Sequence, residues 1–428
     1  MREHADIPGS SRGQALIVGG GLVGASLAIA LDAAGCSATL VEAAAPRAPA
    51  QPSYDERNLA LARATVNALA ALGVWKHAQG ATPITRLHVS RAGEFGAARL
   101  SAREAGVDAL GATLPARELA GALEQRLSEC RNITRMMPAK LEKLECLKSA
   151  EMESQGPGLR RDDGKGQGWR ATIRIGDDIR EIETKLLIGA DGTGSFVRAQ
   201  AGVAAEEHDY AQSLIVCAIT PEHDPDGCAY ERFSDEGPVA LLPLGGRRCG
   251  LVLTVASEHA GSVLALSDDA FAALAQRRFG WKLGRLSRPG KRQAHHARRV
   301  LAKSLIAPRA VLIGNAAQTV HPIGAQGFNL GLRDALMLAD LIAKADDPGA
   351  GELLRDYAAR RKEDREGVLA FSHGLISLAC LPQAAFAPLR SLALIAFDSV
   401  PPLKRALARR GMGWRGSAPP VATLEAAP

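Results

Sequence analysis

The fold of this chain is decided by the stretch Ile313-Gly-Asn-Ala-Ala-Gln-Thr-Val-His-Pro-Ile-Gly-Ala-Gln-Gly-Phe-Asn-Leu-Gly-Leu-Arg-Asp334. The apolar residues Ala310–Ile313 predict a strand, a Pro/Gly-rich loop follows, and a helix is expected to open at Asn329. The helix start supplies free N–H groups, and three loop glycines let backbone approach a flat, anionic group: Gly314, Gly324 and Gly327. The stretch therefore predicts one half of a clamp for a dinucleotide.

A second glycine-rich loop lies near the N-terminus and predicts the other half of the clamp. Gln14–Val18 predicts a buried strand, Gly19-Gly-Gly-Leu22-Val23-Gly24 turns the chain, and Ala25–Ala34 predicts a helix. The next predicted strand, Ser37–Val41, ends at Glu42. Together these segments make one βαβ unit of the dinucleotide-binding type.

Each glycine of the N-terminal loop has a distinct expected task. Gly19 permits the tight turn, Gly21 lets a pyrophosphate approach, and Gly24 allows close packing of helix on strand. Glu42 can accept hydrogen bonds from ribose hydroxyls, and its charge repels a 2′-phosphate. A tight turn with an incidental acid is the alternative. A nicotinamide-only dehydrogenase would explain this unit but would leave residues 313–334 without a task.

Two further features become candidate ligand-binding residues when they are considered together with the glycine loops. The predicted strand Leu186–Ala190 runs into Asp191-Gly192, which alone is more often a turn than a ligand site. The Asn315 amide can hydrogen-bond ribose or pyrophosphate oxygens without adding negative charge. His321 is a catalytic candidate, although a histidine satisfied within its loop is the commoner case. The pair His295-His296 has no acid partner nearby in sequence and receives no role.

The remaining pattern predicts an α/β protein of two interleaved domains. Helices are expected at Asn58–Leu72 and Pro115–Ser128, short strands within 82–113, an antiparallel sheet within 213–257, and mostly helix from Gly351 onward. A Rossmann-like domain is therefore expected to alternate with an antiparallel-sheet domain, followed by a helical C-terminal region. The expected boundaries are 14–80, 115–200 and 300–345 for the first domain, 81–114 and 201–299 for the second, and 346–428 for the C-terminal region.

Composition and charge are those of an ordinary globular protein. The chain has 428 residues, 46% apolar and 23% charged, and a formal net charge of +6. That charge fits either solubility or a basic face toward anionic lipid, since basic residues gather near the end: Lys404, Arg405, Arg409, Arg410 and Arg415. Basic residues are not interleaved with aromatics, so nucleic acid is a poor expectation as a partner.

Cysteine usage and apolar runs limit the expected setting of the chain. Seven cysteines lack any CxxC spacing, which disfavours zinc and a disulfide framework, so no metal is expected and a reducing cytosol fits. The polar start Met1–Gly13 does not look like a signal peptide, and no run of 18 apolar residues occurs. A soluble or peripheral protein is expected.

These motifs together resemble the class A flavoprotein aromatic hydroxylases, over nearly the whole chain and in the right order. The residues that carry the resemblance are Gly19/Gly21/Gly24, Asp191-Gly192 and Gly314-Asn315. Within that class, Tyr54–Leu61, Thr113–Arg117 and Gly314–Ile323 are similar to the ubiquinone-biosynthesis hydroxylases. Asn315 in place of the usual Asp, with Arg409–Gly413, is most similar to the members that act on 2-polyprenyl-6-methoxyphenol. Gly324-Ala325 departs from the Ala-Gly order of the nearest members.

The resemblance implies a non-covalent FAD spread over both glycine loops. Glu42 would hold the adenosine, the N-terminal loop the pyrophosphate, Asn315 the ribityl–pyrophosphate region, and Gly324–Asn329 the isoalloxazine, with Asp191 behind the groove. Arg57 and Arg117 match FAD-contacting positions, although surface ion pairs are the alternative for both. The implied cofactor-binding residues are Gly19, Gly21, Leu22, Val23, Gly24, Glu42, Arg57, Arg117, Asp191, Gly192, Asn315, Pro322, Gly324, Gln326, Gly327, Phe328 and Asn329.

The resemblance also implies a reaction. NADPH or NADH would reduce the flavin, and O₂ would supply the hydroxyl oxygen for the ring of a polyprenylphenol, with flavin carrying that chemistry. No residue is identified as catalytic. Two alternatives are a flavin oxidoreductase without oxygen insertion, such as a prenyl reductase, and a scaffold component of a biosynthetic complex. A cytoplasmic protein, peripheral on the inner membrane and in complex with other ubiquinone-biosynthesis proteins, is expected.

Overall fold

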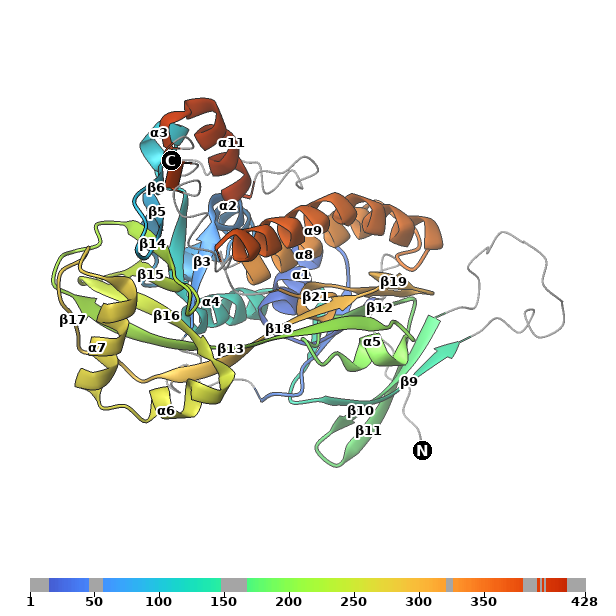
Figure 1. Ribbon diagram of the computed structural model, residues 1–428. Helices are drawn as coiled ribbons and strands as arrows, with labels where there is room; N and C mark the ends of the chain where they lie inside the picture. Colours follow the sequence, from blue (N-terminus) through green and yellow to red (C-terminus); the bar gives the residue numbers. More distant parts are fainter. Residues whose placement is uncertain are drawn as a thin grey trace.

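The protein contains two large β-sheets (Figure 1). The computed structural model describes residues 15–45, 57–147, 168–320, 326–379, 391–392, 395 and 398–413. The first sheet has six strands in the order β19-β20-β12-β1-β2-β8. Every neighbouring pair in it is parallel except β19 with β20. Its strands are β1 Ala15–Val18, β2 Ala38–Val41, β8 Ile133–Met136, β12 Leu186–Gly189, β19 Ile306–Ala307 and β20 Ala310–Leu312.

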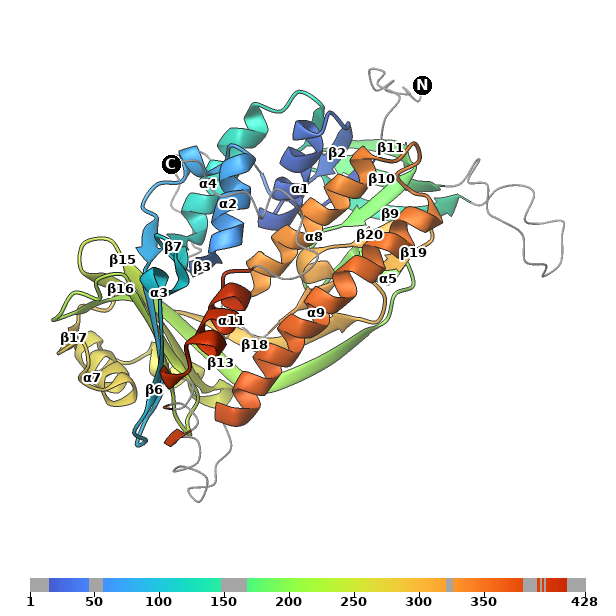
Figure 2. The same cartoon turned by 90° about the horizontal axis from the view of Figure 1, so that it is seen from above.

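Helices cover the six-stranded sheet because its strands are apolar on both faces. All four residues of β1, β2 and β12 are buried, as expected for a central parallel sheet. Figure 2 shows helix α1 (Leu22–Ala33) beside α8 (Gln326–Ala343), with α9 (Gly351–Ala379) along α8. Helix α4 (Ala116–Ser128) joins the same core through Leu119 and Leu123.

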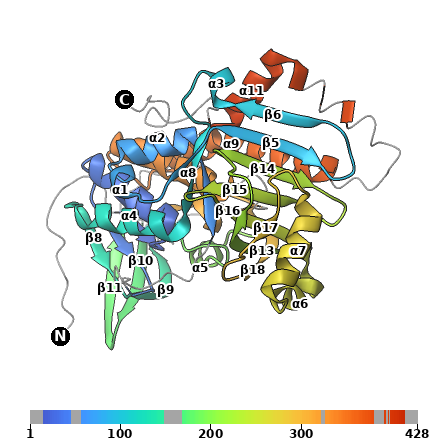
Figure 3. The same ribbon diagram turned by 90° about the vertical axis from the view of Figure 1, so that its left-hand side faces the viewer.

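The second large sheet has nine strands, most of them antiparallel. Its order is β21-β18-β13-β16-β15-β14-β5-β6, and β17 pairs separately with β13. The strands are β5 Arg86–Arg91, β6 Ala97–Ser101, β13 Ala205–Pro221, β14 Cys228–Phe233, β15 Val239–Leu244, β16 Arg248–Ala256, β17 Leu286–Ser287, β18 Gln293–Ala302 and β21 Gln318–Thr319. Helices α6 (Ala260–Leu264) and α7 (Asp268–Phe279) lie on its outer side (Figure 3).

Smaller elements complete the described structure. One three-stranded sheet is β11-β10-β9, and another is β3-β7-β4. Their strands are β3 Asn58–Ala62, β4 Thr82–Ile84, β7 Gly111–Pro115, β9 Lys140–Leu147, β10 Gly168–Ile175 and β11 Asp178–Thr184. The remaining helices named below are α2 Arg63–Ala71, α3 Ala102–Ala105, α5 Phe196–Gln200 and α11 Pro401–Gly411.

The predicted fold class is confirmed, whereas two local predictions are wrong. Asn58–Leu72 is not one helix: its first five residues form β3, and α2 begins at Arg63. Backbone pairing of β3 with β7 prevails there over a helical pattern, because short apolar runs satisfy either period. The helix after the second glycine loop begins at Gln326 and not at Asn329.

Candidate functional site

Two glycines of the N-terminal loop are required by sterics. Gly19 has φ +103°, and a Cβ there would lie 2.5 Å from the carbonyl oxygen of Ala190. A Cβ on Gly24 would lie 1.9 Å from the carbonyl oxygen of Gly19. The loop therefore packs backbone on backbone against the end of β12, where the Asp191 segment begins.

The start of helix α1 offers an open anion site. Gly21 is its N-cap, no side chain caps it, and its first turn holds no acidic residue. A Cβ on Gly21 would meet no atom within 4 Å, so this backbone faces free space. Uncapped N–H groups at the positive end of a helix bind phosphate groups. The loop therefore fits the pyrophosphate of a dinucleotide.

Glu42 lies directly against this loop. Its Oε2 accepts a hydrogen bond from the backbone N–H of Gly20 at 2.6 Å, and its Oε1 accepts one from that of Ala44 at 2.8 Å. A carboxylate has about four lone-pair positions, so acceptor capacity remains for ribose hydroxyls. The structure places Glu42 beside the loop at the end of β2, as the sequence predicted.

The two glycine-rich regions meet at Val23, in the first turn of α1. A Cβ on Gly314 would lie 3.1 Å from Val23, and a Cβ on Gly331 would lie 2.6 Å from Val23 Cγ2. Gly314 itself has φ +56°, a conformation that favours glycine. The segment that follows β20 is thus packed directly on the start of α1. This contact joins the two halves of the predicted clamp.

Asp191 shapes the site through its neighbours. Its Oδ1 accepts a hydrogen bond from the Ser195 hydroxyl at 2.5 Å, and its Oδ2 accepts one from the backbone N–H of Val197 at 3.0 Å. Both oxygens therefore hold the start of α5. From that helix, Arg198 donates to the carbonyl oxygens of Ala316 and Thr193, each at 2.9 Å. Asp191 is thereby connected to the second loop, and Gly192 follows it with φ +85°.

A buried charge network holds the second loop from behind. Asp334 Oδ2 accepts from the backbone N–H of Gly314 at 3.1 Å and from Gln318 Nε2 at 2.6 Å. Its Oδ1 accepts from Arg361 Nε at 2.7 Å. Arg361 Nη1 and Arg333 Nε each donate to Asp364, both at 2.7 Å. The four charged side chains of this network are no more than 5% exposed.

Within this network, Asp364 is ionised despite its burial. Burial by itself raises the pKa of Asp364, but the positive charges of Arg333 and Arg361 lower that pKa to about 2. Sequence reasoning missed this network. Two signals for it were present: an adjacent Arg-Asp pair on the buried part of α8, and Arg361 one turn before Asp364 in α9.

Arg57 and Arg117 are brought together by strand pairing. Asn58 of β3 pairs with Pro115 of β7, and the N–H of Ala116 donates to the carbonyl oxygen of Arg57 at 2.9 Å. Both arginine side chains are exposed, and Arg117 Nε lies 3.3 Å from Glu118 Oε1. Two residues far apart in sequence thus lie at the same end of the β3–β7 strand pair.

The residues predicted to line the isoalloxazine lie at the start of α8, and they differ in how deeply they are buried. Asn329 is 2% exposed; its Oδ1 accepts from the Ala62 N–H at 2.9 Å, and its Nδ2 donates to the Ala60 carbonyl at 3.0 Å. This side chain anchors α8 to β3. A Cβ on Gly327 would meet nothing within 4 Å, so that turn of helix borders free space. Gln326 is buried, and Phe328 packs partly buried against the main core.

The remaining predicted site residues are placed as follows. Asn315 is exposed within the turn after β20, where its amide is open to a ligand. Pro322, Gly324 and His321 lie outside the described residues. His296 is a surface residue 3.0 Å from Asp209. Among the residues that the structure describes, no group of His, Cys, Asp and Glu could hold a metal ion.

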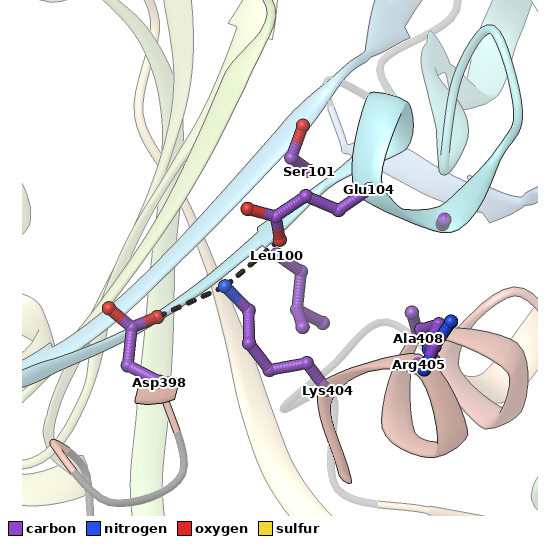
Figure 4. A pocket seen from close by; sticks show the side chains of 8 residues that line it. Leu100, Ser101, Glu104, Asp398, Lys404, Arg405 and Ala408 are labelled. Carbon is purple, nitrogen blue, oxygen red and sulfur yellow. Dashed lines mark ion pairs between the residues drawn. The ribbon is translucent and has the colours of Figure 1, made fainter. Parts of the chain in front are cut away.

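A pocket of about 350 Å³ lies away from the glycine loops, between β6, α3 and α11 (Figure 4). Lys404 Nζ reaches across it to Glu104 Oε2 at 2.9 Å and to Asp398 Oδ1 at 3.4 Å. Lys404 is thus paired with carboxylates from two other segments. This pocket fastens the C-terminal helix to the nine-stranded sheet and is no candidate for the cofactor.

Fold and site together define a dinucleotide-binding flavoprotein with a second, sheet-based domain beside the cofactor loops. The sequence model of the family "FAD binding domain" matches residues 12–372. The chain belongs to this family, and the predicted cofactor FAD is confirmed. Within the described helices, none is long and apolar enough to cross a membrane.

Curated relatives match over nearly the full length. The "Ubiquinone hydroxylase UbiL" of Rhodospirillum rubrum is 34% identical over 93% of this chain and 89% of its own. The "3-demethoxyubiquinol 3-hydroxylase" of Escherichia coli is 31% identical over 93% of this chain and 97% of its own. The predicted resemblance to the ubiquinone-biosynthesis hydroxylases is therefore confirmed.

Solved structures agree on the fold. The p-nitrophenol 4-monooxygenase PnpA of Pseudomonas putida superposes with a TM-score of 0.73 at 16% identity, covering 95% of this chain and 99% of its own. PqsL of Pseudomonas aeruginosa superposes with a TM-score of 0.70 at 20% identity, covering 90% and 99%. At such identities the likeness concerns architecture alone.

Proposed function

We propose that this chain is an FAD-dependent monooxygenase that hydroxylates the aromatic ring of a polyprenylphenol in ubiquinone biosynthesis. The observation that carries the proposal is the packing of Gly314 and Gly331 on Val23, which joins two cofactor loops, in a chain 27–34% identical to ubiquinone hydroxylases over at least 93% of its length. NAD(P)H is the reductant and O₂ the oxygen source. When bound, FAD passes electrons from the nicotinamide to O₂ and activates the oxygen.

Each part of the chain has a task in this proposal. The six-stranded sheet with its helices is the FAD domain, and the nine-stranded sheet is the substrate domain. The start of α1 holds the pyrophosphate, Glu42 the adenosine ribose, and Asn315 the ribityl region. Asp191 orders the groove wall, and the start of α8 borders the isoalloxazine. Arg57 and Arg117 reach the cofactor from one end of the β3–β7 strand pair.

The substrate is proposed to be 2-polyprenyl-6-methoxyphenol, because Asn315 and Arg409–Gly413 are most similar to the members acting on it. The relatives' names include a 3-demethoxyubiquinol hydroxylase, so the ring position is the point to test. A flavin oxidoreductase without oxygen insertion is not favoured, because the curated relatives with named activities are hydroxylases and monooxygenases.

Deletion of the gene tests this proposal. Loss of the protein should stop ubiquinone synthesis and accumulate a precursor that lacks one ring oxygen, identified by mass spectrometry. Purified FAD-loaded protein with NAD(P)H and O₂ should convert that precursor to the hydroxylated product. An unchanged quinone pool, or flavin oxidation that yields only hydrogen peroxide with the accumulated precursor, would contradict the proposal.

Peripheral membrane contact is part of the proposal, because a polyprenyl chain resides in lipid. Four large apolar side chains are exposed at the β5–β6 turn and near the C-terminus: Phe95 at 62%, Leu392 at 56%, Val400 at 43% and Ile395 at 40%. A Cβ on Gly96 would lie 2.8 Å from the Ser391 carbonyl, so these segments touch. Basic residues of α11 lie nearby in sequence, a combination that suits an anionic lipid surface.

Vesicle sedimentation tests this contact. The protein should sediment with vesicles containing anionic lipid, and Phe95→Ser should reduce that binding, while Trp281→Ser, at another exposed apolar residue, should not. Equal binding by both variants would contradict the contact. A cytoplasmic location and association with other ubiquinone-biosynthesis proteins belong to the same proposal and are tested by fractionation and co-purification.

A further inference from the structure

The two faces of the nine-stranded sheet differ in burial. On the outer face, Leu241 and Leu251 are almost fully buried against Phe271 and Phe279 of α7. On the inner face, alternate residues of the same strands are only half-buried. These are Val89 of β5, Ala240, Leu242 and Leu244 of β15, and Val252 of β16. The inner face is therefore an apolar surface that the described residues cover incompletely.

The inner face meets the elements of the cofactor site. A Cβ on Gly250 of β16 would lie 2.5 Å from Asn58 Nδ2, so β3 begins directly on this face. Two and four residues further along β3, Ala60 and Ala62 hold the Asn329 side chain of α8. In Figure 1 the sheet lies between α7 on one side and β3 with α8 on the other. An aromatic ring that reacts at the cofactor loops would therefore rest on this inner face.

One carboxyl group interrupts the apolar inner face. Glu231 of β14 pairs in register with Val89 of β5 and Ala240 of β15, both inner-face residues. Its neighbour Tyr230 is on the outer face, where its ring lies 5.7 Å from that of Phe279. Glu231 lies two strands from Gly250 and two residues along, roughly 10 Å by 7 Å.

Among the described residues, Glu231 has no polar partner. Within the described part of the chain its carboxyl group makes no hydrogen bond or ion pair, although it is half-buried. Arg91, two residues beyond Val89 on β5, is engaged with Glu94 and Asp235. Burial raises the pKa of Glu231 to about 7, and no nearby charge contributes to that shift. A carboxyl group that is partly withdrawn from water without a partner is costly, and such groups are typical of functional sites.

We propose that Glu231 receives the phenolic hydroxyl of the substrate ring on the inner face of the sheet. This inference rests on the proposed function and supplies the catalytic base that the sequence did not reveal. The apolar residues around Glu231 suit the ring and its prenyl chain. The carboxylate accepts the hydrogen bond, and then the proton, of the phenol.

A new C–O bond forms at the ring carbon with one oxygen atom from O₂ as the O–O bond breaks. At the same time the phenol O–H bond breaks, and its proton passes to a Glu231 carboxylate oxygen. The ring is oxidised and becomes a dienone. The ring carbon then loses its own proton to water, the ring regains aromaticity, and the proton on Glu231 returns to the phenol oxygen. NAD(P)H supplies the electrons that reduce the second oxygen atom to water.

Binding of two matched probes tests the inference. The FAD-loaded protein is titrated with 2-prenylphenol and with its methyl ether, which lacks the donor, and the absorbance of the bound flavin is followed. The native protein should prefer the phenol by about tenfold, as for a hydrogen bond to a charged acceptor. Glu231→Gln should lower that preference to about twofold or less. Glu231→Asp should restore part of it, and the control Glu236→Gln, in the exposed turn after β14, should keep it.

The rate adds a second readout. Hydroxylation by the native protein should rise with pH through about 7, as Glu231 loses its proton, and Glu231→Gln should lack this rise. A Glu231→Gln variant that keeps the phenol preference, or a native protein without one, would overturn the inference. A preference that depends on Glu231 in a protein that makes no hydroxylated product would support the inference and overturn the proposed function. If the native protein forms the hydroxylated product but Glu231→Gln leaves the phenol preference unchanged, the proposed function would stand and the inference about Glu231 would fall.

Discussion

Around the six-stranded sheet the groups proposed to bind the cofactor are mainly backbone atoms, whereas on the nine-stranded sheet the group proposed to bind the substrate is a side chain. Gly19, Gly21 and Gly24 act by having no side chain, and their spacing is visible in the sequence. Glu231 acts by a single carboxyl group among apolar neighbours, and its strand has no motif. A site built from glycine backbone can thus be recognised from residue spacing in the sequence. A site built from a single side chain can be recognised only once the order of the strands in the sheet is known.

The largest effect is expected from adding a methyl group at Gly24, where the N-terminal glycine loop packs against its own backbone. Gly24→Ala places a Cβ 1.9 Å from the Gly19 carbonyl oxygen, so the protein should purify without FAD and unfold at lower urea concentration. Gly21→Ala meets no protein atom and should keep its urea midpoint while losing about tenfold in FAD affinity. Flavin absorbance and urea titration measure both. If Gly24→Ala purified with stoichiometric FAD, the proposal that FAD binding depends on the bare glycine backbone of this loop would be contradicted.

A smaller but still large effect is expected in the network behind the second loop. Asp334→Ala removes one of the two carboxylate partners of the buried Arg361 and frees the N–H of Gly314, at a cost of about 3–5 kcal/mol in the free energy of unfolding. The exposed pair Arg360–Asp356 is the control, and Asp356→Ala should cost less than about 1 kcal/mol. Equal urea midpoints for the two variants would show that the network does not hold the loop.

Glu42→Ala tests the side chain that is proposed to hold the adenosine ribose. Loss of a ribose acceptor, and of the bond to the Gly20 N–H, should weaken FAD binding by about tenfold. Glu42→Gln keeps an acceptor oxygen and should lose less. Quenching of flavin fluorescence on binding gives both affinities. Full flavin retention in Glu42→Ala would remove Glu42 from the adenosine site.

The smallest effect concerns pH and the stability of the nine-stranded sheet. Because burial raises the folded pKa of Glu231 to about 7, its contribution to stability is complete below the unfolded pKa and is lost as pH rises through about 7. Glu231→Gln should therefore raise the melting temperature by about 2 °C at pH 8 and hardly change it at pH 4. Thermal scans at both pH values measure this. A shift of equal size at both would show that Glu231 ionises as an ordinary exposed carboxyl.

Some regions of the fold could be predicted from the sequence, and others could not. The α1 unit, the strand before Asp191, and the loop after β20 were readable because glycine spacing and apolar runs are local signals. The division of 58–72 into β3 and α2 was not, because it depends on the distant β7. The Asp334 network was missed for the same reason, since its partners lie on two helices that pack only in the folded chain.

The sequence by itself determined an α/β flavoprotein with two cofactor loops, because backbone geometry at glycines and strand ends follows from neighbouring residues. It also identified the family, through motifs in the right order. Only the tertiary structure decided that Val23 is wedged between Gly314 and Gly331. It alone also decided that Glu231 lies on the inner face of the sheet with no partner among the described residues. Burial and partnership are properties of packing between distant segments, and no local pattern encodes them.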